Sequence, residues 1–277
     1  MRKLVAALSA VALTVLIPAT ATAGGNDEAV IGDITGDSLP DRITFGRAWD
    51  NNCMVVVEPG KPGGGYDWGQ TYLYESPVSY EPYCASMGEL VDLGGGVKEL
   101  VTTNFWNDGD AGLVALRLEN NAITVVGKYA GVPDPNFVQQ ADFTGDGRGD
   151  VWVYSDQYWR LRSFNTTSTG DLVPGSISEC TGRAPQYVLA DFDGDGGQDM
   201  LAALDCGTRS AKLLYGGNRP ALTLGSISGS GPQFKVYLAD NNGDQYPDVT
   251  VDTPQPDYSI VTKRYVNDGA GNFTPLP

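Results

Sequence analysis

The chain has 277 residues, with 34 Asp or Glu against 18 Lys or Arg, and its formal net charge is −16. It contains no histidine, which excludes imidazole general bases, histidine–zinc sites and Ser–His or Cys–His nucleophiles. Nucleic acids and anionic membrane surfaces are bound by basic patches, so we expect neither as a partner of this acidic chain.

The amino terminus has the composition of a secretory signal peptide. Two basic residues and an apolar run, residues 4–17, precede a small-residue cleavage site at Ala21-Thr22-Ala23. The run is too short to span a membrane comfortably, and no other stretch approaches about 18 apolar residues. We therefore expect residues 1–23 to be removed. The remainder, residues 24–277, is predicted to be one secreted, monomeric domain without a membrane span.

A nine-residue, aspartate-rich pattern recurs along the rest of the chain. Its four intact copies are Asp33–Asp41, Asp142–Asp150, Asp191–Asp199 and Asp240–Asp248. Each copy has Asp at positions 1, 5 and 9 and Gly at position 4, and the last three copies begin 49 residues apart. A degenerate copy, Asp92–Glu99, lies between the first two intact ones. A repeat of this period predicts a repeat architecture.

Short β-branched and aromatic runs flank each loop. Residues 186–190 precede the Asp191 loop, residues 200–204 follow it, and runs at 211–215 and 221–224 complete the unit. Gly, Pro and Asn turns separate such runs, and no helical periodicity follows the signal peptide. The sequence thus predicts an all-β fold of five units. Each unit has four antiparallel strands, with the aspartate-rich loop between the first and second.

Five units of about 50 residues favour a five-bladed β-propeller. A solenoid is the alternative, but its terminal repeats need polar outer faces and its units are usually shorter. Because an open row of blades leaves sheet edges exposed, we expect the blades to close into a ring.

The oxygen-rich loops indicate a hard cation, above all Ca²⁺. Donors at positions 1, 3, 5 and 9 can converge on one ion if the backbone coils tightly, which Gly at position 4 permits. An EF-hand is excluded because no copy has Glu at position 12. The Asp191 copy, with four carboxylates, should bind most tightly, since Thr35, Thr144 and Asn242 are neutral at position 3. The alternative is that the Asp-Gly clusters only form turns.

The loops between paired strands resemble the FG-GAP, or VCBS, repeats of the integrin α-subunit propeller. Residues 267–273, Asn-Asp-Gly-Ala-Gly-Asn-Phe, are similar to secreted bacterial VCBS repeats. The resemblance covers essentially the whole mature chain. It departs from the family in the degenerate copy, where Gly94 and Gly96 replace ligands and Lys98 intrudes, so we expect no Ca²⁺ there.

The resemblance implies about four Ca²⁺ sites, with position 7 of each loop contributing its backbone carbonyl. The implied ligands are Asp33, Thr35, Asp37, Leu39 and Asp41; Asp142, Thr144, Asp146, Arg148 and Asp150; Asp191, Asp193, Asp195, Gly197 and Asp199; and Asp240, Asn242, Asp244, Tyr246 and Asp248.

Up-and-down strand order would place the aspartate-rich loops and the third-to-fourth-strand turns on one face, and the other connections on the opposite face. Four cysteines in an exported chain predict two disulfides, with three possible pairings. We expect Cys53–Cys84 and Cys180–Cys206, because each pair then joins neighbouring loops on the opposite face. Crossed pairs would span distant blades.

Aromatic residues beside acidic or amide residues on the opposite face suit the recognition of sugars or peptides. Trp49, Trp106 and Trp159 are the candidate ligand contacts. The alternative is that such aromatics pack between blades, as we expect for Trp152 and Tyr154.

These features favour a secreted, calcium-binding propeller that binds glycans or extracellular proteins without catalysis, and no catalytic residue is assigned. A polysaccharide-active hydrolase or lyase is one alternative, because a carboxylate pair such as Asp108 and Asp156 could supply acid and base without histidine. A structural or accessory domain of the cell envelope is the other.

Overall fold

The computed structural model describes residues 29–47, 52–74, 84–85, 87–104, 112–130, 137–155, 158–229, 231–255 and 257–277. The predicted signal peptide lies outside these ranges. Within them the chain forms twenty β-strands and no helix, which confirms the all-β prediction. No helix long and apolar enough to cross a membrane is found in the described part of the chain.

The strands form five four-stranded antiparallel sheets, each a meander in chain order, as predicted. The first sheet contains β1 (Val30–Gly32), β2 (Asp41–Arg47), β3 (Cys53–Glu58) and β4 (Gln70–Tyr74). The second contains β5 (Gly88–Val91), β6 (Glu99–Asn104), β7 (Gly112–Glu119) and β8 (Ala122–Ala130). The third contains β9 (Phe137–Ala141), β10 (Asp150–Ser155), β11 (Arg160–Thr166) and β12 (Leu172–Cys180). The fourth contains β13 (Gln186–Ala190), β14 (Asp199–Asp205), β15 (Thr208–Leu214) and β16 (Leu222–Ser228). The fifth contains β17 (Lys235–Ala239), β18 (Asp248–Pro254), β19 (Ile260–Asn267) and β20 (Phe273–Pro275).

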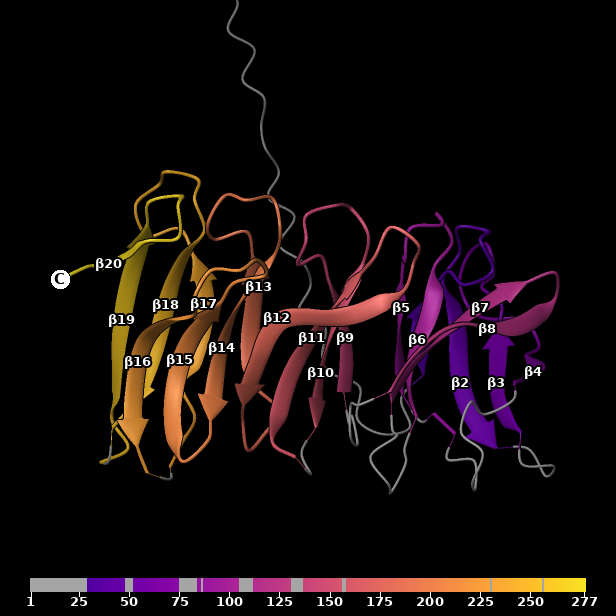
Figure 1. Ribbon diagram of the computed structural model, residues 1–277, viewed down its shortest axis with the longest axis horizontal. Coiled ribbons are helices and arrows are strands. Elements are labelled where there is room, and N and C mark those ends of the chain that lie inside the picture. Colours follow the sequence, from indigo (N-terminus) through magenta and orange to yellow (C-terminus); the bar gives the residue numbers. More distant parts are fainter. Residues whose placement is uncertain are drawn as a thin grey trace, which may run out of the picture.

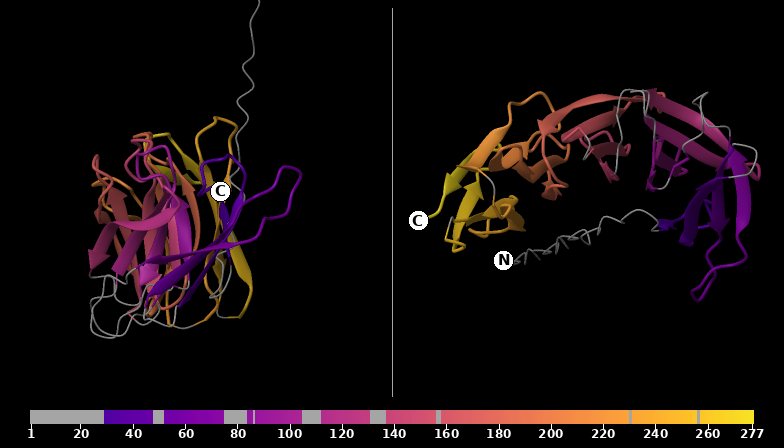
Figure 2. Two further views of the ribbon diagram at one scale, coloured as in Figure 1. Left: turned by 90° about the vertical axis from the view of Figure 1, so that its right-hand side faces the viewer. Right: turned by 90° about the horizontal axis from the view of Figure 1, so that it is seen from below.

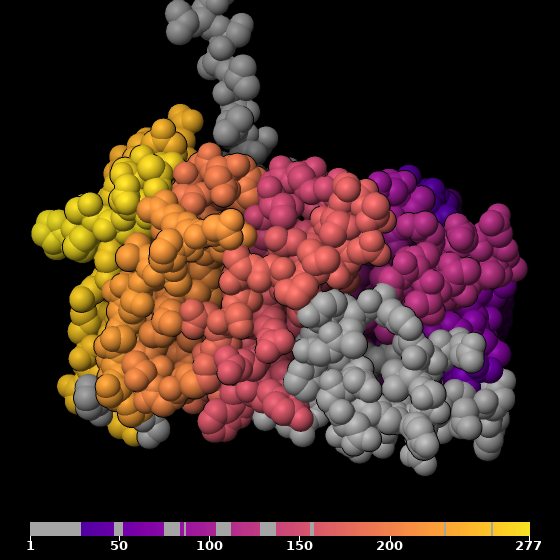
Figure 3. All heavy atoms as spheres, viewed as in Figure 1, coloured from indigo at the N-terminus to yellow at the C-terminus, as the bar shows by residue number. Residues whose placement is uncertain are grey.

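The five sheets stand side by side in chain order (Figures 1 and 3). Neighbouring sheets contact each other through their first strands, as β1 does with β5, β5 with β9 and β13 with β17. Seen from below, the sheets follow an arc with the first and fifth sheets at its two ends (Figure 2, right). The described residues therefore form an open arc, and the expected closed ring is not formed.

The cores lie between the sheets, because each inner sheet is covered on both faces. All six residues of β10 are buried for this reason. Trp152 on β10 packs between Phe137 and Tyr187, with ring centroids 4.8 Å and 4.7 Å away. Trp152 and Tyr154 both belong to the core between the third and fourth sheets, as predicted. Aromatic burial of this kind stabilises the contact between consecutive units.

The outer face of the fifth sheet is polar. Successive residues of a strand point to opposite faces, so β14 directs Leu201 and Ala203 toward the fifth sheet. The corresponding residues of β18 are Thr250 and Asp252. They lie on the face away from the fourth sheet, since Val249 and Val251 face it.

The outer face of the first sheet is mixed, because Arg42, Thr44 and Glu58 share it with the exposed apolar residues Ile31 and Leu73. Ile43 on β2 belongs to the core shared with the second sheet, so Arg42 and Thr44 lie on the free face. There Arg42 forms an ion pair with Glu58 on β3, at 2.7 Å. A polar outer face on a terminal sheet is what an open repeat array requires, and β18 supplies one in the fifth sheet. This face accounts in part for the difference from the expected ring, because β18 offers Thr250 and Asp252, and no apolar pair, to a further blade.

The connections segregate to two faces as predicted. The first-to-second-strand loops and the third-to-fourth-strand turns lie together along the upper edge in Figure 1, and hydrogen bonds join them. The disulfides Cys53–Cys84 and Cys180–Cys206 are formed as expected, with Cα–Cα distances of 5.1 and 5.7 Å. Two disulfides fit an oxidising, extracellular environment.

Candidate metal-binding loops

The four intact loops share one backbone form, held by their own carboxylates. In the Asp191 loop, the position 1 carboxylate accepts the amides of Gly194 at 2.7 Å and Gly196 at 3.1 Å. The position 5 carboxylate of Asp195 accepts the amide of Gly197 at 2.8 Å. Bonds of the same pattern hold the loops that begin at Asp33, Asp142 and Asp240.

Two positions of each loop require left-handed backbone. Gly at position 4 has a positive φ in all four copies, namely 80°, 67°, 76° and 81° at Gly36, Gly145, Gly194 and Gly243. This confirms the predicted reason for glycine, since other residues adopt this region at a cost. Position 6 is left-handed too, although Ser38 and Gln245 occupy it in the first and last copies, with φ of 68° and 75°. The sequence pattern did not reveal this second turn.

The position 9 aspartates begin the second strands and are fully buried. In the Asp191 loop, Asp199 accepts Phe192 N and Gly216 N, both at 2.9 Å. One oxygen thus holds the start of the loop, and the other holds the third-to-fourth-strand turn. The same two-sided bonding is made by Asp41, Asp150 and Asp248. These carboxylates therefore fasten two loops together, a role that the motif alone did not indicate.

The Asp191 loop brings three acidic side chains together. Oxygens of Asp191, Asp193 and Asp195 lie within 4.8 Å of one another. Asp193 Oδ1 is buried and has no hydrogen-bond partner among the described residues. Burial, followed by the charge of Asp195, raises the pKa of Asp193. Burial also raises the pKa of Asp199 to about 7, with Asp193 and Asp195 adding to it. An unpaired oxygen among mutually repelling carboxylates fits a bound cation.

A positive side chain lies beside this cluster. The Arg219 guanidinium is 3.7 Å from Asp193 Oδ2 and stacks over the Tyr215 ring at 4.6 Å. It also donates to the carbonyls of Ala270 and Gly271 in the last turn of the fifth sheet. Arg219 therefore partly neutralises the Asp191 loop and ties it to the fifth sheet.

The other intact loops gather fewer acidic groups. Within the described chain, no second group of three acidic side chains converges as the Asp191 loop does. In the Asp142 loop Arg148 forms an ion pair with Asp146, and in the Asp240 loop Asn242 donates to Asp244 at 2.6 Å. The expectation of about four sites, and of the individual ligands in these loops, stays a prediction.

The degenerate loop replaces the buried aspartate by a longer residue. Glu99 is fully buried and accepts Leu93 N at 3.1 Å, as the position 9 aspartates accept an amide from the start of their loops. Its other oxygen accepts the Arg117 guanidinium, with Nε at 2.9 Å, in place of a backbone amide. Sequence reasoning missed both residues. The signal was a Glu directly before a β-like run, where the intact copies have Asp.

On the opposite face the structure describes one of the three candidate tryptophans. Trp159 is 55% exposed, and its backbone is in the left-handed region. Its carbonyl accepts a hydrogen bond from Thr181 N at 2.9 Å, next to the Cys180–Cys206 disulfide. Trp49 and Trp106 lie outside the described residues, as do Asp108 and Asp156. A binding role for the tryptophans stays a prediction.

Neither a protein-family model nor a curated protein sequence matches the chain. Among solved structures, it is similar to a protein from Lactobacillus plantarum, with TM-score 0.45 and 10% identity over 93% of this chain and 85% of that one. It is also similar to the V. cholerae biofilm matrix protein Bap1, with TM-score 0.41 and 17% identity over 91% of this chain and 39% of Bap1. For AofleA from Arthrobotrys oligospora the TM-score is 0.39 and the identity 10%, over 92% and 71% of the two chains. Similarity at this level assigns the chain to no family.

Proposed function

We propose that the protein is a secreted, calcium-stabilised binding module of the FG-GAP/VCBS propeller type, built as an arc of five blades. Its ligands are glycans or extracellular proteins. The observation that carries the calcium assignment is the buried, unpaired Oδ1 of Asp193 within the carboxylate cluster of the Asp191 loop. Five sheets with aspartate-rich loops at one edge support the propeller-type assignment.

Asp191, Asp193 and Asp195 would hold the ion in the fourth sheet. Bound Ca²⁺ would neutralise carboxylates that otherwise repel one another, and so would stabilise the loop. The buried Asp199 already holds the start of the same loop through Phe192 N and ties it to the neighbouring turn through Gly216 N. The ion therefore acts on a loop that the fold has largely shaped, which favours a stabilising role over a switching one.

Calorimetric titration and thermal unfolding test this proposal. With Ca²⁺ about 100-fold above Kd, one site stabilises the fold by about 2.7 kcal/mol. For a chain of this length that raises Tm by roughly 5–10 °C over the value in excess chelator. Asp193→Asn is expected to remove the tightest site and most of this difference.

Glu119→Gln is the matched control. Glu119 is the last residue of β7, next to the third-to-fourth-strand turn on the same face, and the substitution removes one negative charge outside the loops. It should leave the heat of binding and the calcium-dependent Tm unchanged. If the wild-type protein shows neither heat nor a shift in Tm, the loops are Asp-Gly turns and the proposal fails.

A further inference from the structure

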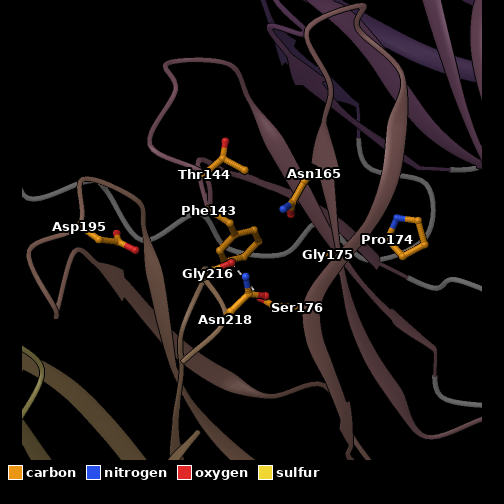
Figure 4. Close-up of a pocket in the computed structure, with 10 residues that line it drawn as sticks. Phe143, Thr144, Asn165, Pro174, Gly175, Ser176, Asp195, Gly216 and Asn218 are labelled. Atoms are coloured by element: carbon orange, nitrogen blue, oxygen red, sulfur yellow. Dashed lines mark hydrogen bonds between the residues drawn. The ribbon is translucent and has the colours of Figure 1, made fainter. Parts of the chain in front are cut away.

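A cavity of about 440 Å³ opens between the third and fourth sheets on the aspartate-loop face (Figure 4). Its walls come from the Asp142 loop, from β12 and the end of β11, from the Asp191 loop and from the β15–β16 turn. Ser176 Oγ ties two of these walls together by donating to the carbonyls of Tyr215 and Gly216, at 3.0 and 2.8 Å. The volume is within the range of small-molecule sites, roughly 300–1,000 Å³.

The cavity exists because one repeated position holds a small side chain. Thr166 N and Gly216 N make the equivalent bonds to the position 9 aspartates, so the residues just before them, Asn165 and Tyr215, correspond. In the fourth sheet Tyr215 is buried and donates its hydroxyl to Gly271 O of the fifth sheet, at 2.9 Å. In the second sheet the position holds Arg117, which pairs with Glu99. Asn165 fills less space than either residue.

The polar groups of the cavity include both acceptors and donors, because Asn165 and Asn218 each carry a carbonyl oxygen and an NH₂ group. Asn165 Oδ1 is buried without a partner among the described residues, and Figure 4 shows the amide directed toward the space near Thr144 and Phe143. The Ser176 hydroxyl proton is engaged by main-chain carbonyls, and the Thr144 hydroxyl bonds to Asp150. The lone pairs of these two hydroxyls remain to accept, whereas the Asp195 carboxylate at the edge of the cavity belongs to the proposed calcium site. A ligand that both donates and accepts hydrogen bonds therefore matches these groups.

Hydroxyl groups suit this cavity better than a single cation does. Neutral acceptors outnumber the one carboxylate, and the acceptors come from both sheets. Phe143 and Pro174 add apolar contacts of the kind that the C–H faces of a sugar ring make. We propose that the cavity between the third and fourth sheets binds a saccharide residue, with the side-chain amide of Asn165 among its polar contacts. This names the ligand class and site of the binding role proposed above, and it rests on that role.

Saturation-transfer NMR on the calcium-loaded protein tests the assignment. The probes are D-glucose, D-galactose, D-mannose, L-fucose and N-acetyl-D-glucosamine, with the diamine putrescine as a cationic comparison. At least one sugar should receive saturation. Asn165→Leu, which keeps the volume and removes the polar atoms, should weaken its binding about tenfold. Asn165→Tyr, which introduces the residue of the fourth sheet, should abolish it.

The readouts separate this proposal from the calcium proposal. Each Asn165 variant is first checked for a wild-type Tm and a wild-type heat of calcium binding. If both are unchanged and sugar binding is lost, the result supports the cavity site. If Asn165→Tyr unfolds, Asn165→Leu decides alone. No signal from any of the five sugars, binding unchanged in the Asn165 variants, or binding of putrescine alone would overturn the assignment. Loss of sugar binding in Trp159→Ala but not in Asn165→Leu would place the site on the opposite face and would overturn it as well.

Discussion

The buried carboxylate at the start of β2 tests how the loops are held. Asp41 is fully buried and accepts three main-chain amides, from Ile34 at 2.9 Å, Thr35 at 3.0 Å and Gly60 at 3.0 Å. Asp41→Asn keeps one acceptor oxygen but turns an NH₂ group toward at least one of these amides. A hydrogen bond to a charged group contributes about 1.5–3 kcal/mol, and a buried donor left unpaired costs about 1–3 kcal/mol. We expect the free energy of unfolding to fall by about 2–4 kcal/mol, with or without calcium.

Urea unfolding in excess chelator and in excess calcium measures this loss, and hydrogen exchange at the Gly60 amide reports it locally. Asp37→Asn is the control. The Asp37 carboxylate is exposed and accepts only Leu39 N, at 2.8 Å, so its loss in chelator should stay below about 1 kcal/mol. An Asp41→Asn protein within about 0.5 kcal/mol of wild type in chelator would refute the scaffold role. The buried aspartate would then matter only through a bound ion.

Two further predictions concern packing and pH. Gly194→Ala should destabilise the fold more than Gly36→Ala. Both positions have left-handed backbone, which costs a residue with a Cβ about 1–2 kcal/mol. Only at Gly194 would the new Cβ also lie 2.8 Å from a neighbouring atom, Gly269 O of the fifth sheet. If urea unfolding shows equal losses of unfolding free energy for the two variants, the backbone at Gly269 moves aside at no cost and the prediction is wrong. Burial raises the pKa of Tyr187 to about 12, and its hydroxyl donates to Gln139 at 2.6 Å. Because the folded pKa exceeds the unfolded value of about 10, this stability is complete below pH ~10 and is lost between pH ~10 and ~12, by roughly 2–3 kcal/mol. Unfolding of Tyr187→Phe over that pH window should lack this component, and an unchanged slope would contradict the assignment.

Much of the fold was predictable because the repeat marks its own strands. The ninth residue of each intact copy begins the second strand of its sheet, at Asp41, Asp150, Asp199 and Asp248. Each copy also fixes the left-handed glycine at position 4. The disulfide pairs followed from the same register, since meandering strands bring only neighbouring connections together on one face.

The fastenings between loops could not be predicted. The partners of Asp41 and Asp248 are backbone amides of Gly60 and Asn267, and every residue type except proline has such an amide. The sequence also does not show that Arg117 takes the place of a backbone amide as a donor to Glu99. This role follows only from the register of β7 beside β6. Which repeated position leaves a cavity likewise becomes apparent only after the sheets are superimposed.

Ring closure was predicted from the exposure of sheet edges, without comparing the outward-facing residues of the second strands unit by unit. An alignment of the second strands contains the relevant information: Thr250 and Asp252 stand where β14 has Leu201 and Ala203. The repeat period predicts the number of units. Whether the units form a closed ring or an open row depends on the side chains that the terminal units present.

The polar outer face of β18 makes the fifth unit different from the inner units in what it can pack against. An inner unit such as residues 142–190 has apolar side chains on both faces, so a tandem copy of it would find a matching neighbour on each side. Removing the fifth sheet would instead expose Leu201, Leu213 and Phe192 to water. A lengthened variant should therefore keep the fifth unit at the end of the row and gain its additional unit in the interior.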